Sequence, residues 1–197
     1  MTKHLPKLIL ASRSPRRREL LAATGYDFEV LPPSDDAESG TCGDETPAEL
    51  VVRLACQKAA DVAGRLCRDQ FTRVVLGCDT VAECGGKILG KPADREDARA
   101  MLTLLGGQEH RVYSGLCLWP LPEGEPMVRV AVTALRMDPL APELLDDYIA
   151  GGQWQGKAGA FGYQDGLDWV HVVEGSESNV VGLPLELLAE MLERFSG

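Results

Sequence analysis

Three consecutive arginines stand where a helix is expected to begin. Arg16, Arg17 and Arg18 follow Ser14 and Pro15, a pair typical of an N-cap and a first helical residue. Their charges repel the partial positive charge that the helix macrodipole places in its first turn. A bound anion would offset this conflict, because free backbone N–H groups and arginine side chains both suit phosphate. The segment therefore predicts either a phosphate site or a solvated basic turn.

An acid and two lysines elsewhere in the chain could complete such a site. Asp79 directly follows residues 73–78, which predict a buried strand, so it is expected at the sheet edge where open α/β sheets bind ligands. Asp79 and Thr80 could also form an ordinary turn. Lys58 lies on an apolar helical stripe, where its ammonium group must either reach solvent or meet an anion. With Lys91 in a loop and the arginines above, these residues predict a polyphosphate cleft.

Two further segments carry groups that could take part in chemistry. The acidic loop PPSDDAESGTCGDE, residues 32–45, could supply a metal ligand, or its carboxylates could simply be hydrated. The glycine-spaced loop GGQWQGKAGAFGYQD, residues 151–165, allows close backbone approach to a ligand, and Lys157 and Gln164 add a charge and an amide. His110 could serve as a base, but a single histidine entering a strand more often has a structural role.

Several other phosphate chemistries fit the sequence poorly. GGKILGKP is not a P-loop, because no Ser or Thr follows its last lysine to hold magnesium. Cys67 and Arg73 have the C-x5-R spacing of a cysteine phosphatase, but RDQFT between them contains no glycine to form a phosphate-cradling loop. A haloacid-type phosphatase would need a second aspartate two residues after Asp79, where Val81 stands.

Alternating strand and helix patterns provide the elements that must position these residues. Strands are expected at 8–10, 28–31, 73–78 and 169–174, and residues 110–119 and 127–135 predict an antiparallel hairpin, so the sheet should be mixed. Helices are expected from Pro15 to about Gly25, from a Thr46 capping box to about Leu66, after Asp94, over 142–150 and over 183–195.

Composition limits the classes of protein that fit. The 197 residues suit one α/β domain with two lobes, and a net charge of −10 with 45% hydrophobic residues argues for a folded, acidic protein that does not bind nucleic acid. Six cysteines without a CxxC pair argue against a zinc site or disulfide framework and favour reduced thiols. No 18-residue apolar run and no signal peptide is present, so we expect a cytoplasmic protein without a membrane span.

Six motifs, in their order and spacing, resemble the Maf family of nucleoside triphosphate pyrophosphatases: SRSPRRREL, VVRLACQKA, LGCDTV, ILGKP, GQEHRVYSG and GKAGAFGYQD. The resemblance covers essentially the whole chain. It implies a mixed, twisted α/β sheet flanked by helices, with two lobes around a cleft, similar to the inosine triphosphatase fold and often a homodimer. It also implies hydrolysis of a nucleoside triphosphate to the monophosphate and pyrophosphate with a divalent metal cation, Mg²⁺ or else Mn²⁺ or Co²⁺.

The resemblance also implies residue roles. It makes Asp79 the base that activates water and a metal ligand, Arg16, Arg17, Lys58 and Lys91 the phosphate-binding cations, and Ser12 the first serine of the signature. It places the second metal ligand on Glu38, although Ala37 stands where the family usually has an acid and Gln57 precedes Lys58 in place of a glutamate.

Three positions in the family separate enzymes for dTTP and UTP from enzymes for methylated guanine nucleotides. Here they are Arg16, Thr80 and Gln164, which resemble the pyrimidine set. A glutamine amide can donate to and accept from the edge of uracil or thymine, whereas a cationic methylated guanine would favour an acid and an aromatic face. The alternatives are a pyrophosphatase for methylated guanine triphosphates and a non-catalytic nucleotide-binding regulator of growth or division.

Overall fold

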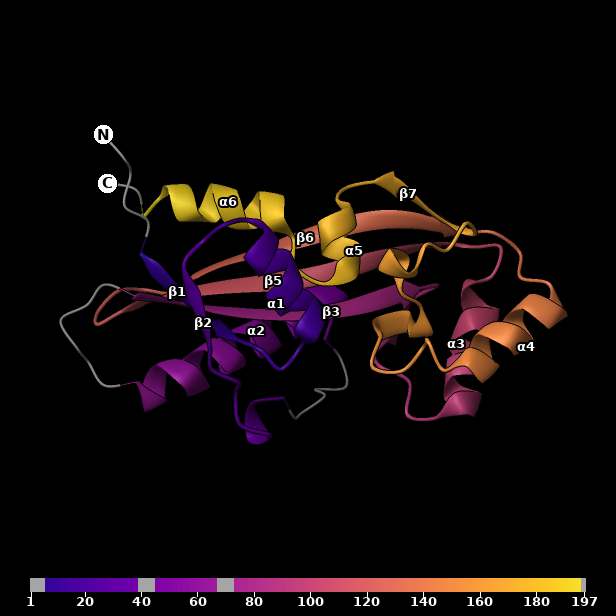
Figure 1. Ribbon diagram of the computed structural model, residues 1–197, viewed down its shortest axis with the longest axis horizontal. Helices are drawn as coiled ribbons and strands as arrows, with labels where there is room; N and C mark the ends of the chain where they lie inside the picture. The colour runs from indigo at the N-terminus through magenta and orange to yellow at the C-terminus, as the bar shows by residue number, and fades with distance from the viewer. Residues whose placement is uncertain (1–5, 39–44, 67–72, 196–197) are drawn as a thin grey trace.

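The computed structural model describes residues 6–38, 45–66 and 73–195, and in it a seven-stranded sheet runs along the molecule (Figure 1). The strand order is β2-β1-β3-β5-β6-β7, with β4 paired to β3. Pairs β1–β2 and β1–β3 are parallel and the others are antiparallel, which confirms the mixed sheet. The strands are β1 (Lys7–Ala11), β2 (Phe28–Val30), β3 (Arg73–Cys84), β4 (Lys87–Leu89), β5 (Glu109–Leu121), β6 (Met127–Met137) and β7 (Val170–Glu174).

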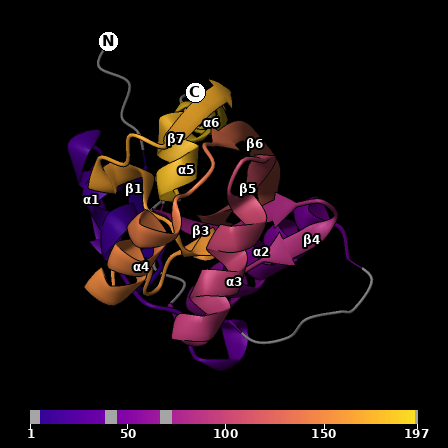
Figure 2. The ribbon, with the colours of Figure 1, turned by 90° about the vertical axis from the view of Figure 1, so that its right-hand side faces the viewer.

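Helices cover both faces of this sheet, as the sequence predicted. Figure 1 shows α2 below the sheet and α6 above it, and Figure 2 shows α3 and α4 together at one end. Side chains alternate between the faces along each buried strand. Leu8 and Leu10 of β1 pack in one cluster with α6, whereas Ile9 packs in another cluster with α2. The helices are α1 (Pro15–Ala23), α2 (Pro47–Arg65), α3 (Arg95–Leu105), α4 (Pro142–Gly151), α5 (Glu177–Val181) and α6 (Leu185–Glu193).

β3 is longer than the sequence predicted, and this changes the setting of Asp79. We expected a strand over 73–78 with Asp79 just after it, but β3 continues to Cys84. Its parallel pairing with β1 ends at Gly77, whereas its antiparallel pairing with β5 continues to Glu83. Asp79 therefore lies inside a strand, two residues beyond the end of the parallel pairing. The expected position at the carboxyl edge of the parallel strands is retained.

The helix expected over 183–195 is confirmed as α6, but the sequence analysis did not predict the short helix before it. The short helix α5 precedes α6, with the Ser176 side chain accepting a hydrogen bond from the backbone N–H of Asn179 as its N-cap. Gly182 follows α5 with φ of +124°, a conformation that favours glycine. None of the helices in the described ranges has the length and hydropathy needed to cross a membrane.

We predict that Gly77→Ala strongly destabilises the fold, because α2 lies directly against β3 at this position. A Cβ atom on Gly77 would come within 2.2 Å of the Ala55 carbonyl oxygen, which belongs to the backbone and cannot rotate away. Overpacking of this kind costs about 3 kcal/mol of unfolding free energy. Urea denaturation measures this change. The control is Gly64→Ala on α2, where the new Cβ meets no atom of the described residues within 4 Å, so this change should be neutral or stabilising. Equal stability of the two variants would contradict the close packing.

Candidate active site

A cavity of about 330 Å³ opens beside the end of the parallel pairing between β1 and β3. Its walls come from the loop before α1 and the first turn of α1, from α2, β3, β5 and α5, and from the segments around residues 91 and 156–161. Among the described residues, five basic side chains and one carboxylate, that of Asp79, line it. This excess of positive charge repels itself unless an anion binds. The basic lining residues are Arg13, Arg16, Arg17, Lys58 and Lys91.

The start of α1 faces this cavity through a short serine loop. Ser14 caps the helix, and its hydroxyl accepts a hydrogen bond from the backbone N–H of Arg17. The backbone N–H of Ser14 in turn donates to the Ser12 hydroxyl, whose side chain is buried. This arrangement fixes the turn between β1 and α1 and directs the first helical residues toward the cavity. The predicted phosphate-binding turn thus forms part of the cavity wall.

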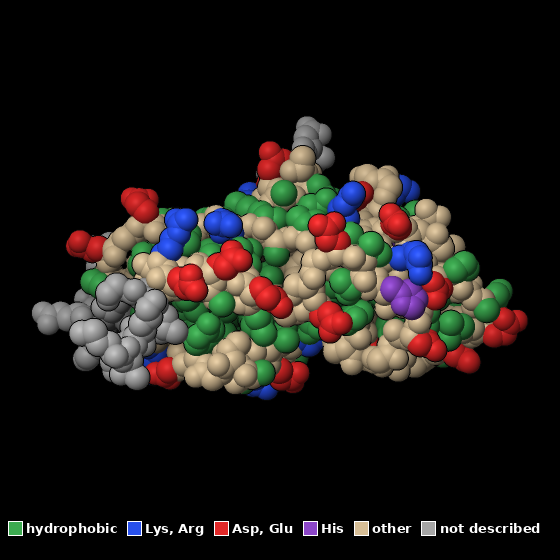
Figure 3. Space-filling model, turned by 90° about the horizontal axis from the view of Figure 1, so that it is seen from above, with side chains coloured by type: hydrophobic (Ala, Val, Ile, Leu, Met, Phe, Trp, Pro, Cys, Tyr) green, Lys and Arg blue, Asp and Glu red, His purple; other side chains and the backbone are tan. Residues whose placement is uncertain are grey.

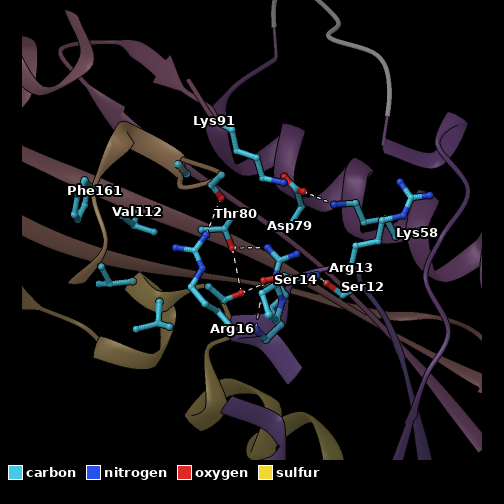
Figure 4. Close-up of a pocket in the computed structure, with 17 residues that line it drawn as sticks. Ser12, Arg13, Ser14, Arg16, Lys58, Asp79, Thr80, Lys91, Val112 and Phe161 are labelled. Carbon is cyan, nitrogen blue, oxygen red and sulfur yellow. Dashed lines mark hydrogen bonds and ion pairs between the residues drawn. The ribbon is translucent and has the colours of Figure 1, made fainter. Parts of the chain in front are cut away.

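Asp79 and Lys58 form the polar centre of the cavity. The Lys58 Nζ lies 2.6 Å from the Asp79 Oδ1, and their side chains are only 7% and 15% exposed. Lys58 therefore does not reach out to solvent from its apolar stripe on α2, because it meets a carboxylate instead. Figure 4 shows the Lys91 side chain pointing toward Asp79 from the other side.

The two arginines of α1 have different partners. The Arg16 Nη2 donates a hydrogen bond to the Gly156 carbonyl at 2.7 Å. Burial, and then the neighbouring Arg17 charge, lower the pKa of Arg16 from its usual value. Arg17 instead donates to three different groups, two backbone carbonyls and a threonine hydroxyl. Both arginines line the cavity, as the sequence predicted.

The glycine-spaced loop is tied to the loop that carries Lys91. The backbone N–H of Gly159 donates to the Gly90 carbonyl at 3.0 Å. Gly159 and Ala160 have φ of +69° and +64°, and this left-handed conformation is costly for alanine. A backbone held in this way next to a cavity is typical of a functional loop.

The opposite end of the cavity is apolar. Val112 of β5 and Phe161 lie away from Asp79 in Figure 4, with Thr80 and Arg16 between the two ends. The Phe161 ring packs against the edge of His110, with ring centroids 5.4 Å apart. The cavity therefore has a charged end for an anion and an apolar end for a flat, uncharged group.

His110 is buried behind this apolar end, and in the described part of the chain neither of its ring nitrogens has a partner in good hydrogen-bond geometry. It does not line the cavity, so the structural interpretation fits it better than the role of a base. Burial lowers the pKa of His110 to about 4. The histidine therefore remains neutral at neutral pH.

We predict that His110 makes the fold less stable in mild acid. Between pH 6.5 and 4 the unfolded chain binds a proton that the folded protein does not, so the unfolding free energy decreases as the pH falls and levels off below pH 4. From pH 7 to pH 5 this loss should be about 2 kcal/mol. Urea denaturation at both pH values measures the unfolding free energy. Its decrease from pH 7 to pH 5 should be smaller by this amount in His110→Leu than in the wild type. The same pH dependence in both proteins would contradict the buried, neutral state.

Three sequence predictions fall outside this cavity or outside the described residues. Gln164 lies exposed in the 3-10 turn Tyr163–Asp165 and does not line the cavity. The backbone of Glu38 ends the 3-10 turn Asp36–Glu38, but its side chain lies outside the described part of the structure. Cys67, of the cysteine phosphatase alternative, is also outside the described residues.

Several lining residues were not predicted as site residues, among them Arg13, Val112 and Phe161. Arg13 lies in the same motif as the other arginines, and its guanidinium donates to the Pro33 carbonyl at 2.8 Å and pairs with Asp35. Val112 and Phe161 carry no chemical signal of their own, because apolar residues in a strand or loop usually indicate core packing. Only the fold brings them to the cavity.

Comparison with known proteins gives one consistent result. A family model described as Maf-like protein matches residues 7–195. A dTTP/UTP pyrophosphatase of Rhodopirellula baltica is 53% identical over 95% of this chain and 82% of its own length. A dTTP/UTP pyrophosphatase of Pelotomaculum thermopropionicum is 40% identical over 97% of both chains. The structure of the Staphylococcus aureus Ham1 protein superposes with a TM-score of 0.53 at 13% identity, over 96% of this chain and 99% of that one, which shows a shared fold.

Proposed function

The chain belongs to the Maf-like protein family, and we propose that it hydrolyses dTTP and UTP to the nucleoside monophosphate and pyrophosphate. The observation that carries this proposal is that the Asp79 carboxylate lines the same cavity as five basic side chains of the described residues. Phosphoanhydride hydrolysis needs these two kinds of group: cations that neutralise phosphate oxygens and a base that accepts a proton from water.

The two ends of the cavity suggest how the nucleotide lies in it. The triphosphate would occupy the charged end, near Lys58, Lys91 and the start of α1. The nucleobase would occupy the apolar end, against Phe161 and Val112. The role of Gln164 in nucleobase selectivity stays a prediction, because its side chain is exposed and does not line the cavity.

Asp79 would accept the proton of the water that attacks the phosphoanhydride. As water adds to phosphorus and the bond to pyrophosphate breaks, negative charge increases on the leaving pyrophosphate, where the basic side chains can stabilise it. Lys58 donates to Asp79 through Nζ, and it also lines the cavity where the triphosphate would lie. Lys58 would thus both orient the base and hold substrate.

A divalent cation, Mg²⁺ in the first place, is part of this proposal. Within the described residues there is no cluster of three or more potential metal-ligating side chains, but Asp79 faces the cavity where the triphosphate would lie. One carboxylate fits Mg²⁺, which is commonly held by one or two carboxylates together with phosphate oxygens and water. Asp79 would hold the ion, with Glu38 as its predicted second ligand, and the ion would neutralise phosphate charge.

We also propose that the protein is a cytoplasmic homodimer without nucleic-acid partners. The dimer rests on the family resemblance, and light scattering of the purified protein measures it. The net charge of −10 opposes binding to a phosphate backbone. On the face that Figure 3 shows, acidic side chains are spread among the basic ones, and the described residues form no continuous basic track there.

Steady-state kinetics with a panel of triphosphates tests the choice of substrate. We expect kcat/KM for dTTP and UTP to exceed that for 7-methyl-GTP by at least tenfold, which corresponds to about 1.4 kcal/mol of transition-state binding. Equal or greater activity on 7-methyl-GTP would favour the guanine-type alternative. Binding of the triphosphates without turnover would favour the non-catalytic regulator.

A further inference from the structure

We propose that Arg17 is a positioning residue for Asp79 and that it does not act mainly as a phosphate ligand. This inference rests on the proposed function, because its effect is measured on the same reaction. It departs from the role that the family resemblance implies for Arg17. It also separates Arg17 from Arg16, its neighbour in the same helical turn.

The guanidinium of Arg17 is largely occupied by the protein itself. Its Nη1 donates to the Cys78 carbonyl at 2.8 Å, and its Nη2 donates to the Thr80 hydroxyl at 3.0 Å. Its Nε donates to the Gly182 carbonyl at 2.7 Å. Three of the five N–H groups of an arginine are therefore engaged, and each of the three nitrogens has a partner.

Two of these partners are the residues on either side of Asp79. Because side chains alternate along a strand, Thr80 points to the opposite face of β3 from Asp79. Asp79 meets Lys58 of α2 on one face, and Thr80 meets Arg17 of α1 on the other. Arg17 thus holds β3 on the face opposite Asp79, through one hydrogen bond to the residue before Asp79 and one to the residue after it.

β3 needs such a partner at this point because β1 ends there. The last parallel pair joins Ala11 to Gly77, so within the described ranges no strand pairs with Cys78 on the side of β1. The Arg17 donor satisfies the Cys78 carbonyl, a group that is costly to leave unpaired when it is shielded from water. The strand is therefore fixed where its pairing on one side has ended.

The third contact ties this part of β3 to the turn after α5. The Gly182 carbonyl accepts from Arg17 and also lies 3.3 Å from the Thr80 hydroxyl and from the Cys78 Sγ. The Thr80 hydroxyl further pairs with Ser114 of β5 at 2.8 Å. Arg17 is thus the central donor of a network that joins α1, β3 and α5 around the base.

Arg17→Lys keeps the positive charge but cannot reach three acceptors at once, so it separates charge from positioning. We expect kcat for dTTP to fall roughly 10- to 100-fold, as misplacing a reacting group does, while KM and the inhibition constant of inorganic tripolyphosphate change less than about threefold. The matched control is Arg16→Lys, because the Arg16 side chain donates to the protein only at the Gly156 carbonyl among the described residues. Its KM and its tripolyphosphate inhibition constant should rise more than its kcat falls.

The single variant Thr80→Val keeps the proposal testable if Arg17→Lys folds poorly, and a double-mutant cycle extends the test if both variants fold. Thr80→Val removes the acceptor for Nη2 and should lower kcat while tripolyphosphate inhibition is retained. In Arg17→Lys combined with Thr80→Val, the loss of kcat should be smaller than the product of the single losses. Weaker tripolyphosphate binding with unchanged kcat in Arg17→Lys, or independent effects in the cycle, would overturn the proposal. A wild-type protein that releases no pyrophosphate would instead overturn the proposed function.

Discussion

Asp79→Asn should reduce pyrophosphate release from dTTP by roughly 10²–10⁴-fold, the usual contribution of a general base. Asparagine has nearly the same shape as aspartate, but its amide cannot accept a proton at neutral pH. The Lys58 ammonium can still donate to the amide oxygen, so the local packing should survive. Since the basic side chains that would bind the triphosphate remain, the dissociation constant of dTTP should change much less than kcat.

The measurement combines steady-state kinetics with binding of dTTP by calorimetry. The matched control is Asp147→Asn on the exposed side of α4, which removes the same charge away from the cavity and should leave kcat unchanged. Activity of Asp79→Asn close to that of the wild type would exclude Asp79 as the base. A parallel loss of binding and kcat would make it a substrate ligand instead.

Lys58→Ala should lower kcat/KM by roughly 100-fold and leave the melting temperature unchanged or higher. The ammonium orients Asp79 and faces the expected position of the triphosphate, so activity depends on it twice. For stability, however, it is one of the five cations that line the cavity with the Asp79 carboxylate in the described part of the chain, and it lies buried on an apolar stripe. Removing the Lys58 charge ends its repulsion with the four other cations, which offsets the loss of its ion pair with Asp79.

Thermal denaturation and kinetics of the same preparations measure the two effects. Lys87→Ala, an exposed lysine in β4, is the control and should change neither quantity. A fall of more than about 8 °C in the melting temperature would correspond to well over 1 kcal/mol of lost stability. With full activity of the folded fraction, such a fall would make Lys58 a structural residue only.

Local patterns in the sequence were sufficient for most of the fold. The Ser14-Pro15 start of α1, the Thr46 capping box of α2 and the antiparallel hairpin β5–β6 were all predicted, because each depends on neighbouring residues. The full length of β3 was not, because its last residues are held by β5, which lies more than 25 residues away in the chain. The short helix α5 was missed because its polar sequence ESNVV resembles a loop.

The candidate site was predictable to a similar extent. Its charged residues were found because a lysine on an apolar stripe and arginines at a helix start conflict with their expected surroundings. The contacts of Arg17 were not predictable, because two of its three acceptors are backbone carbonyls, which every residue type supplies. The apolar end was missed for a related reason, since Phe161 reaches the cavity through the left-handed turn at Gly159 and Ala160.

Identification of the products of dTTP hydrolysis tests the central proposal most directly. Purified protein, Mg²⁺ and dTTP should give thymidine monophosphate and pyrophosphate in equal amounts, with no thymidine diphosphate. The products are identified by ³¹P nuclear magnetic resonance. If the Asp79→Asn variant, prepared in the same way, is inactive, the turnover does not come from a contaminating enzyme. Formation of the diphosphate and inorganic phosphate, or the absence of turnover with each triphosphate of the panel, would contradict the proposed function.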